Sequence, residues 1–73
     1  MASTSKATPE LIRQAVAAGV AAAERGAYRV PGRCQTCAEI VKGWRPGHGA
    51  EEIFLAWLRA YDLTNLQQEA AAA

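Results

Sequence analysis

The shortage of large aliphatic side chains is the feature that most constrains how this chain can fold. Of its 73 residues 37 are apolar, but 17 of these are alanine, and Leu, Ile, Val and Phe together number only 13. A chain of this length buries about 60% of the surface that its unfolded form exposes. The sequence therefore predicts one small domain with a thin core, and it leaves no room for separate cofactor and substrate domains.

The alanines of the first segment are spaced as in a helix. The segment begins with three residues typical of a helix N-terminus. Thr8 has a hydroxyl that can cap the helix, Pro9 suits the first helical position, and the negative charge of Glu10 is favourable at the positive end of the helix dipole. One stripe then carries Leu11 followed by small residues at helical intervals: Ala15, Ala18, Gly19 and Ala22. Gly26 suits the left-handed position that ends a helix. The pattern predicts a helix over about 9–25 with a smooth face that another helix can approach closely.

Two further helices are predicted, over about 34–42 and about 50–63. Gly43 stops the second, and the third carries the bulk of the core: Ile53, Phe54, Trp57, Leu58 and Tyr61. A capping-box spacing at Thr64–Gln67 either restarts a short terminal helix or is crossed by the third helix, which then extends to about 70. The fold class is all-α, a three-helix domain over 9–69, with a disordered tail at 1–8 and a frayed one at 70–73.

No segment approaches the roughly 18 apolar residues of a membrane span, and the N-terminal sequence lacks the apolar middle of a signal peptide. We therefore expect a cytoplasmic protein without a membrane partner.

The pair Cys34 and Cys37 has C-x-x-C spacing, which leaves three alternatives open. The two thiols are buried packing residues, or ligands of a zinc ion, or a redox pair. A zinc site would add His48, the one histidine, and a carboxylate, with Glu51 or Glu52 nearest in sequence. Because no second C-x-x-C is present, the packing interpretation is favoured, and no cofactor is predicted apart from zinc as the alternative.

An enzyme is not predicted. His48 lies in a glycine-rich loop with no nucleophile at a known spacing, and no glycine pattern follows a strand to hold a phosphate.

Charge is polarised along the chain although the total is +1. Residues 25–45 carry a net charge of +4, and residues 50–73 carry −3. Arginines neutralise phosphates and aromatic rings stack on exposed bases, so the basic stretch is a candidate RNA-binding segment. Its members are Arg25, Tyr28, Arg29, Arg33, Lys42, Trp44 and Arg45. The alternative is a solvated loop face with Trp44 turned into the core.

The pattern Gly19-x-x-Ala22-Ala23-x-x-Gly26, followed by Cys34 and by Gly43-Trp44-Arg45, resembles the ribosome modulation factor family over about residues 19–45. An alternative register places Trp57-Leu58-Arg59-Ala60-Tyr61 at the Gly-Trp-Arg element. Gln35 and Thr36 follow the cysteine where the family has proline and an aromatic residue. The resemblance implies a small helical bacterial protein that binds the small ribosomal subunit and promotes ribosome dimerisation; a phage protein is the expectation if the chain is instead a protein-binding adaptor.

Leu55 lies off the predicted core stripe of the third helix, as do Leu63 and Leu66. Together with the smooth face of the first helix they indicate an interface for a protein partner or for a second copy of the chain. The alternative is a central third helix that is packed on both sides. The sequence thus predicts a non-enzymatic binding protein, associated with RNA or the ribosome, or else a protein-binding regulator.

Overall fold

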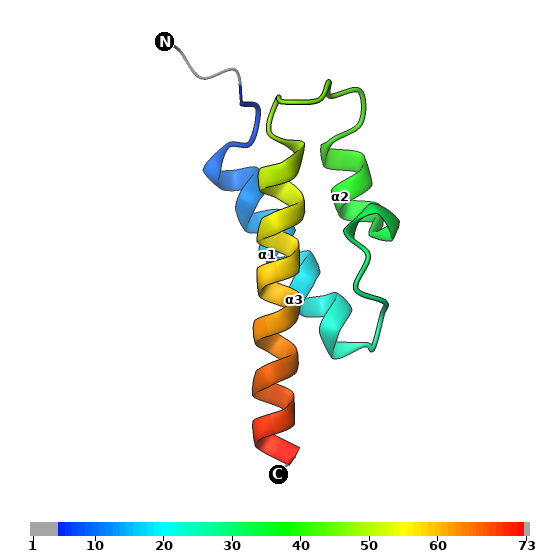
Figure 1. Cartoon of the computed structure of the whole chain (residues 1–73), viewed down its shortest axis with the longest axis vertical. Coiled ribbons are helices and arrows are strands. Elements are labelled where there is room, and N and C mark those ends of the chain that lie inside the picture. Colours follow the sequence, from blue (N-terminus) through cyan, green and yellow to red (C-terminus); the bar gives the residue numbers. More distant parts are fainter. Residues whose placement is uncertain (1–4, 73) are drawn as a thin grey trace.

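The computed structural model describes residues 5–72 and consists of helices and turns, with no strand in that range. Helix α1 spans Pro9–Glu24, a 3-10 turn η1 spans Pro31–Arg33, α2 spans Gln35–Ile40 and α3 spans Ala50–Ala72. Helices α1 and α3 lie side by side and run in the same direction, and α2 runs the opposite way beside the upper half of α3 (Figure 1). The all-α prediction is confirmed.

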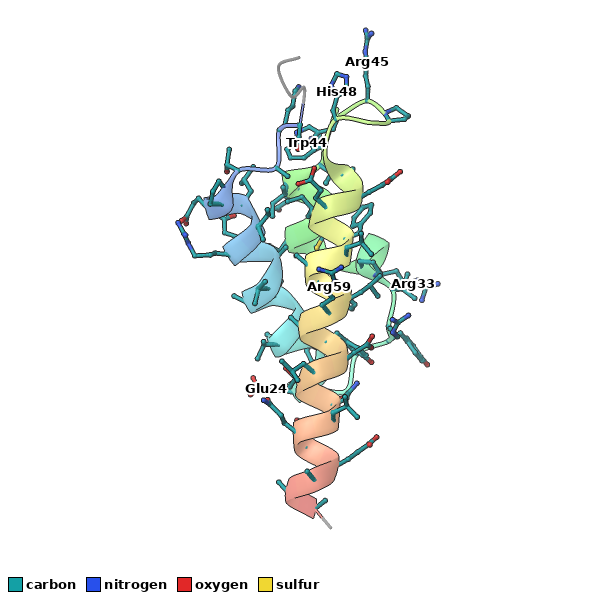
Figure 2. The ribbon with its side chains drawn as sticks, turned by 60° about the vertical axis from the view of Figure 1, so that its left-hand side comes forward. Glu24, Arg33, Trp44, Arg45, His48 and Arg59 are labelled. Carbon is teal, nitrogen blue, oxygen red and sulfur yellow. The ribbon has the colours of Figure 1, made fainter. Side chains whose placement is uncertain are left out.

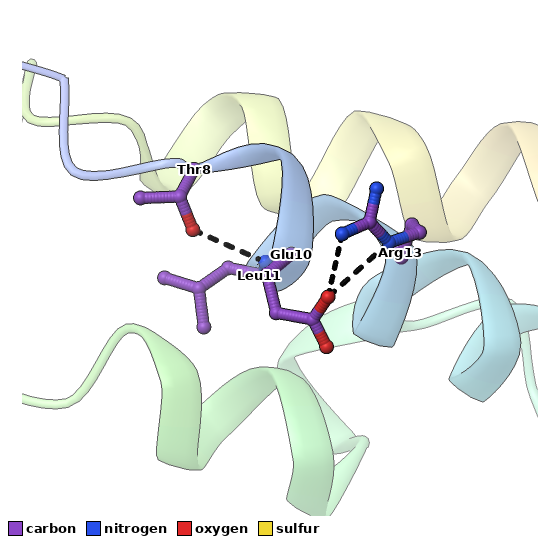
Figure 3. Close-up of polar contacts among 4 residues, drawn as sticks. All are labelled: Thr8, Glu10, Leu11 and Arg13. Carbon is purple, nitrogen blue, oxygen red and sulfur yellow. Dashed lines mark hydrogen bonds and ion pairs between the residues drawn. The ribbon is translucent and has the colours of Figure 1, made fainter.

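Helix α1 begins where the sequence indicates. The Thr8 hydroxyl accepts a hydrogen bond from the backbone N–H of Leu11 at 3.2 Å, and Glu10 is paired with Arg13 at 2.6 Å in the first turn (Figure 3). This cap satisfies one of the N–H groups that a helix leaves without partners.

The end of α1 is also the one predicted. Gly26 has a φ of +74°, and the next residue donates its backbone N–H to the Ala22 carbonyl at 2.9 Å. This is the left-handed C-terminal motif that glycine permits.

The smooth face of α1 packs directly on α3. A methyl group added at Gly19 would overlap the Trp57 carbonyl and lie 3.1 Å from the Ala60 side chain. Ala15 and Ala22, one turn to either side, are fully buried. Because the side chains on this face of α1 are small, the backbones of α1 and α3 come into contact. The aromatic residues of α3 fill the space next to α1, and this compensates for the scarcity of large aliphatic side chains.

The second helix is shorter than predicted. Instead of about 34–42, α2 spans the six residues Gln35–Ile40, and Cys34 precedes it as its cap residue. The chain tightens past Ile40 because the N–H of Lys42 bonds to Glu39, three residues back, before Gly43 takes a φ of +78°. Between α1 and α2 the chain forms the 3-10 turn η1, which leads directly into α2.

Helix α3 runs without interruption to Ala72, so the predicted restart at Thr64 is wrong and the continuous alternative holds. The residues buried along it recur at three- and four-residue intervals: Ile53, Trp57, Ala60 and Thr64. Thr64 is 8% exposed and extends the packed stripe instead of capping a new helix. Residues 70–72, predicted to fray, are helical, and Ala73 lies outside the described residues.

The predicted disordered tail falls partly outside the described residues, which exclude 1–4. Over the part that is described, Lys6 donates its backbone N–H to the His48 carbonyl at 2.6 Å, and the Ser5 hydroxyl donates to Glu52 at 3.0 Å. Residues 5–8 thus lie against the loop that leads into α3.

Within residues 5–72, none of the helices combines the length and the apolar character needed to cross a bilayer.

We expect Gly19→Ala to lower the free energy of unfolding by about 1–3 kcal/mol, because the added methyl group must push α1 away from the Trp57 carbonyl. Gly32→Ala is the matched control, since an added methyl there meets nothing within 4 Å and no positive φ is needed. Thermal unfolding followed by circular dichroism measures both. Equal stability of the two variants would contradict the close approach.

Candidate functional site

The loop between α1 and α2 is fastened to α3 by side chains. The Tyr61 hydroxyl donates a hydrogen bond to the Ala27 carbonyl, and its ring is stacked on Trp57 with centroids 5.0 Å apart. Arg29 donates two hydrogen bonds to the Asp62 carboxylate, each at 2.7 Å. These contacts give the loop a defined shape on the surface of α3.

The Arg29–Asp62 pair changes the role of one predicted nucleic-acid residue. The hydrogen bonds from Arg29, with the attraction of its charge, hold the pKa of Asp62 below the ordinary carboxyl value. The same pair raises the pKa of Arg29. A bidentate contact of this kind occupies the planar guanidinium donors, so Arg29 fixes the loop and is less available to a phosphate.

A hollow of about 170 Å³ opens between this loop and α3. We call it the basic pocket; its lining residues are Arg25, Ala27, Tyr28, Val30, Arg33, Cys34 and Trp57. Three of the predicted nucleic-acid residues therefore meet around one hollow. Tyr28 is 79% exposed, which leaves its ring available to a ligand.

The other predicted nucleic-acid residues lie elsewhere. Trp44 and Arg45 are at the end of the molecule where α3 begins, and Arg33 is about midway along the long axis (Figure 2). Trp44 is half-buried and packs against the core, as the alternative interpretation has it, whereas Lys42 and Arg45 are exposed. The basic stretch of the sequence thus divides into two separate groups in space.

The two cysteines of the C-x-x-C pair differ in their access to the basic pocket. Cys34 lines the pocket, and Cys37, one turn later, is completely buried in the core. Both are free in the structure. Burial, reinforced by the proximity of Cys34, raises the pKa of Cys37 to about 12.

The pKa of the Cys34 thiol is lowered. Burial opposes its ionisation, but the backbone N–H groups of Cys37 and Thr36 and the indole N–H of Trp57 outweigh that effect. The Trp57 Nε1–H is buried close to Cys34 and has no hydrogen-bond partner among the described residues. Such an environment favours the thiolate, which is the reactive form of cysteine.

The predicted zinc ligands are not brought together. His48 lies near Trp44 at the α3 end of the molecule (Figure 2), and Ser5 holds Glu52. Over residues 5–72, no group of three or more His, Cys, Asp or Glu side chains is placed to hold a metal ion. The cysteine pair thus stands without the third and fourth ligands that a structural zinc site requires.

A second, apolar hollow of about 340 Å³ lies between α1 and α3. We call it the apolar groove; its lining residues are Ile12, Val16, Ala56, Arg59, Ala60 and Leu63. Leu63 was predicted as an interface residue, whereas Ile12 and Val16 of α1 were not. Their helical spacing resembles that of core residues, and the groove is evident only in the structure, where its lining comes from α1 and α3 alone.

The three predicted interface leucines are exposed: Leu55 by 49%, Leu63 by 57% and Leu66 by 62%. With 3.6 residues per turn they fall on one side of α3, opposite Trp57, together with Arg59. The alternative that α3 is packed on both sides, with Leu55 in the core, is therefore wrong.

We expect iodoacetamide to modify Cys34 of the folded protein well before Cys37, because Cys34 lines a pocket and has the lower pKa. In the folded protein, the rate at Cys34 should reach half its maximum at a lower pH than it does in the protein unfolded in urea. Mass spectrometry of peptides after timed quenching measures both rates. Equal rates at the two thiols in the folded protein would contradict this arrangement.

Comparison of the chain with protein-family models, with curated proteins and with solved structures finds no significant match.

Proposed function

We propose that this protein is a small RNA-associated regulator, acting on ribosomal or other RNA, that binds unpaired nucleotides through the basic pocket. The observation that supports this is the meeting of Arg25, Arg33 and an exposed Tyr28 around one hollow. The resemblance of residues 19–45 to ribosome modulation factors favours the same class of partner.

The chemistry of the pocket suits a single-stranded nucleotide. An exposed tyrosine ring offers a stacking platform for a base of any identity. Two guanidinium groups on the rim can neutralise neighbouring phosphates, and arginine matches phosphate oxygens with paired donors. The hollow is of the size of one base, so recognition of bases that are unstacked from a helix is favoured over recognition of a duplex.

The distribution of charge over the molecule also supports binding of RNA at the basic pocket. The negative charges of the chain are concentrated on α3, and one of them, Asp62, is already neutralised by Arg29. The pocket face is thereby left with Arg25 and Arg33 as cations for which no ion pair is found among the described residues. A polyanion therefore approaches this face with less repulsion than the near-zero net charge suggests.

We expect the double change Arg25→Ala and Arg33→Ala to weaken binding of a single-stranded RNA oligonucleotide. If each arginine contacts one phosphate, the slope of log affinity against log salt should fall by about 1.4. Tyr28→Ala should cost about 1–3 kcal/mol of binding free energy through lost stacking.

Fluorescence anisotropy across a salt series measures these effects, and Arg13→Ala is the matched control, since that arginine is exposed on α1 and paired with Glu10. Binding by the double variant at wild-type affinity and slope, or an equal loss with Arg13→Ala, would rule out the pocket as the RNA site.

A second candidate function is protein binding through the apolar groove, with a second copy of this chain as the occupant. The specific observation is that a hollow and projecting leucines lie on one side of α3. A twofold pair presents the same patch from both subunits, so leucines of one copy can fill the hollow of the other. Removal of these leucines from water would also stabilise a domain whose core contains few large side chains.

We expect Leu63→Glu to convert a concentration-dependent dimer into a folded monomer, because the change places a charge inside the apolar groove. Val30→Glu is the control, since Val30 is 44% exposed but lies outside the groove. Sedimentation equilibrium over a wide concentration range distinguishes the states, and circular dichroism checks folding. A wild-type protein that stays monomeric at every concentration would eliminate the dimer.

A further inference from the structure

We propose that Cys34 and Cys37 form a redox-active dithiol that exchanges with an anionic disulfide of low molecular mass entering the basic pocket. This activity goes beyond RNA binding and does not depend on it. It rests on the two cysteines, the pocket that reaches one of them, and the groups around the reactive sulfur.

The structure assigns different roles to the two thiols. Cys34 lines the pocket and is 7% exposed, so of the two cysteines it is the one that a small molecule in the pocket reaches. Cys37 is completely buried behind it and is close enough for each thiol to influence the ionisation of the other. An accessible attacking thiol with a shielded second thiol beside it is the arrangement that dithiol–disulfide exchange requires.

An unpartnered donor is present next to the attacking sulfur. Trp57 is 1% exposed, lines the same pocket and has a buried Nε1–H with no nitrogen or oxygen acceptor in the described chain. A buried donor of this kind is costly when left unpaired. A negatively charged Cys34 sulfur can accept a hydrogen bond from this indole N–H. The pocket therefore stabilises the thiolate of Cys34 more than its neutral thiol.

The rim of the pocket selects the charge of the reactant. Arg25 and Arg33 line the same pocket as Cys34. Neither is held by an ion pair in residues 5–72, in contrast to Arg29 and Arg13. A disulfide that carries carboxylates is therefore attracted to the pocket, and a neutral one is not.

The reaction proceeds in two exchanges. The Cys34 thiolate attacks one sulfur of the incoming disulfide, whose S–S bond breaks, and the first thiol leaves after taking up a proton. Cys37 then gives up its proton and attacks the Cys34 sulfur of the mixed disulfide, and the second thiol leaves with that proton. Overall the cysteine pair is oxidised by two electrons to an intramolecular disulfide, and the incoming disulfide is reduced to two thiols.

The test uses the full-length protein with glutathione disulfide as the anionic probe. After folding is checked by circular dichroism, the protein is incubated with the probe, quenched with acid and alkylated. We expect both thiols to become resistant to alkylation and the mass to fall by a pair of hydrogen atoms. The Cys37→Ser variant should instead stop at a stable mixed disulfide on Cys34, while the Cys34→Ser variant should react at a much lower rate.

The arginines are tested by the charge of the probe. The double change Arg25→Ala and Arg33→Ala should slow the reaction with glutathione disulfide by roughly tenfold more at low salt than it slows the reaction with neutral hydroxyethyl disulfide. Arg45→Ala, at the far end of the molecule, is the control and should alter neither rate.

A wild-type protein that keeps both thiols reduced in excess probe while folded would overturn the proposal. So would trapping on Cys37 instead of Cys34. The measurement on the unaltered protein needs no variant, so it tests the proposal even if a cysteine variant does not fold. Because no RNA is present, a negative result here is distinct from a negative result for RNA binding.

Discussion

The contact on which the rest of the structure depends is the close approach of α1 to α3 at Gly19. The α1 backbone lies against the Trp57 carbonyl and the Ala60 side chain, a distance that no larger residue at position 19 permits. Ala15 and Ala22 continue the same smooth surface one turn away in each direction. This chain has few large aliphatic side chains but many small ones. The small residues allow the two helices to pack closely in this way.

Both candidate sites follow from that contact. Trp57 is held at the interface, so one side of its ring stacks on Tyr61 while its indole forms the floor of the basic pocket. Tyr61 and Asp62 then reach the loop that carries Arg29 and bind it in place. On the other side of the helix pair α2 is absent, and this leaves the apolar groove uncovered between α1 and α3.

The parts of the fold that are predictable from the sequence are those governed by neighbours along the chain. The Thr8 cap, the left-handed Gly26 and the small stripe of α1 all follow from local spacing, and each is observed. The continuation of α3 past Thr64, in contrast, is not determined by neighbouring residues in the sequence. The capping spacing is present, but Thr64 faces α1 and is buried there, so tertiary packing decides against a helix end.

The sites depend more heavily on long-range contacts. The sequence identifies Arg25, Tyr28 and Arg33 as members of one basic stretch, but it does not separate them from Lys42 and Arg45, which do not line the basic pocket. The partner of Arg29 is 33 residues away, on another helix, and no spacing rule indicates it. Likewise Val16 has the periodicity of a core residue, yet it is 40% exposed because it lies beside the apolar groove, where no other element covers α1.

The parallel orientation of α1 and α3 has a consequence for how the protein is made. Parallel neighbours cannot be joined by a tight turn, so the chain must travel the whole length of α1 again before α3 can begin, and α2 with its loops serves as this return path. Gly19 and Trp57 are consequently separated by more than half the chain. During synthesis α1 emerges before α3, its main packing partner, so most of its alanine face stays in water until α3 follows. Folding therefore has a larger loop-closure cost than an up-and-down bundle of equal size would have.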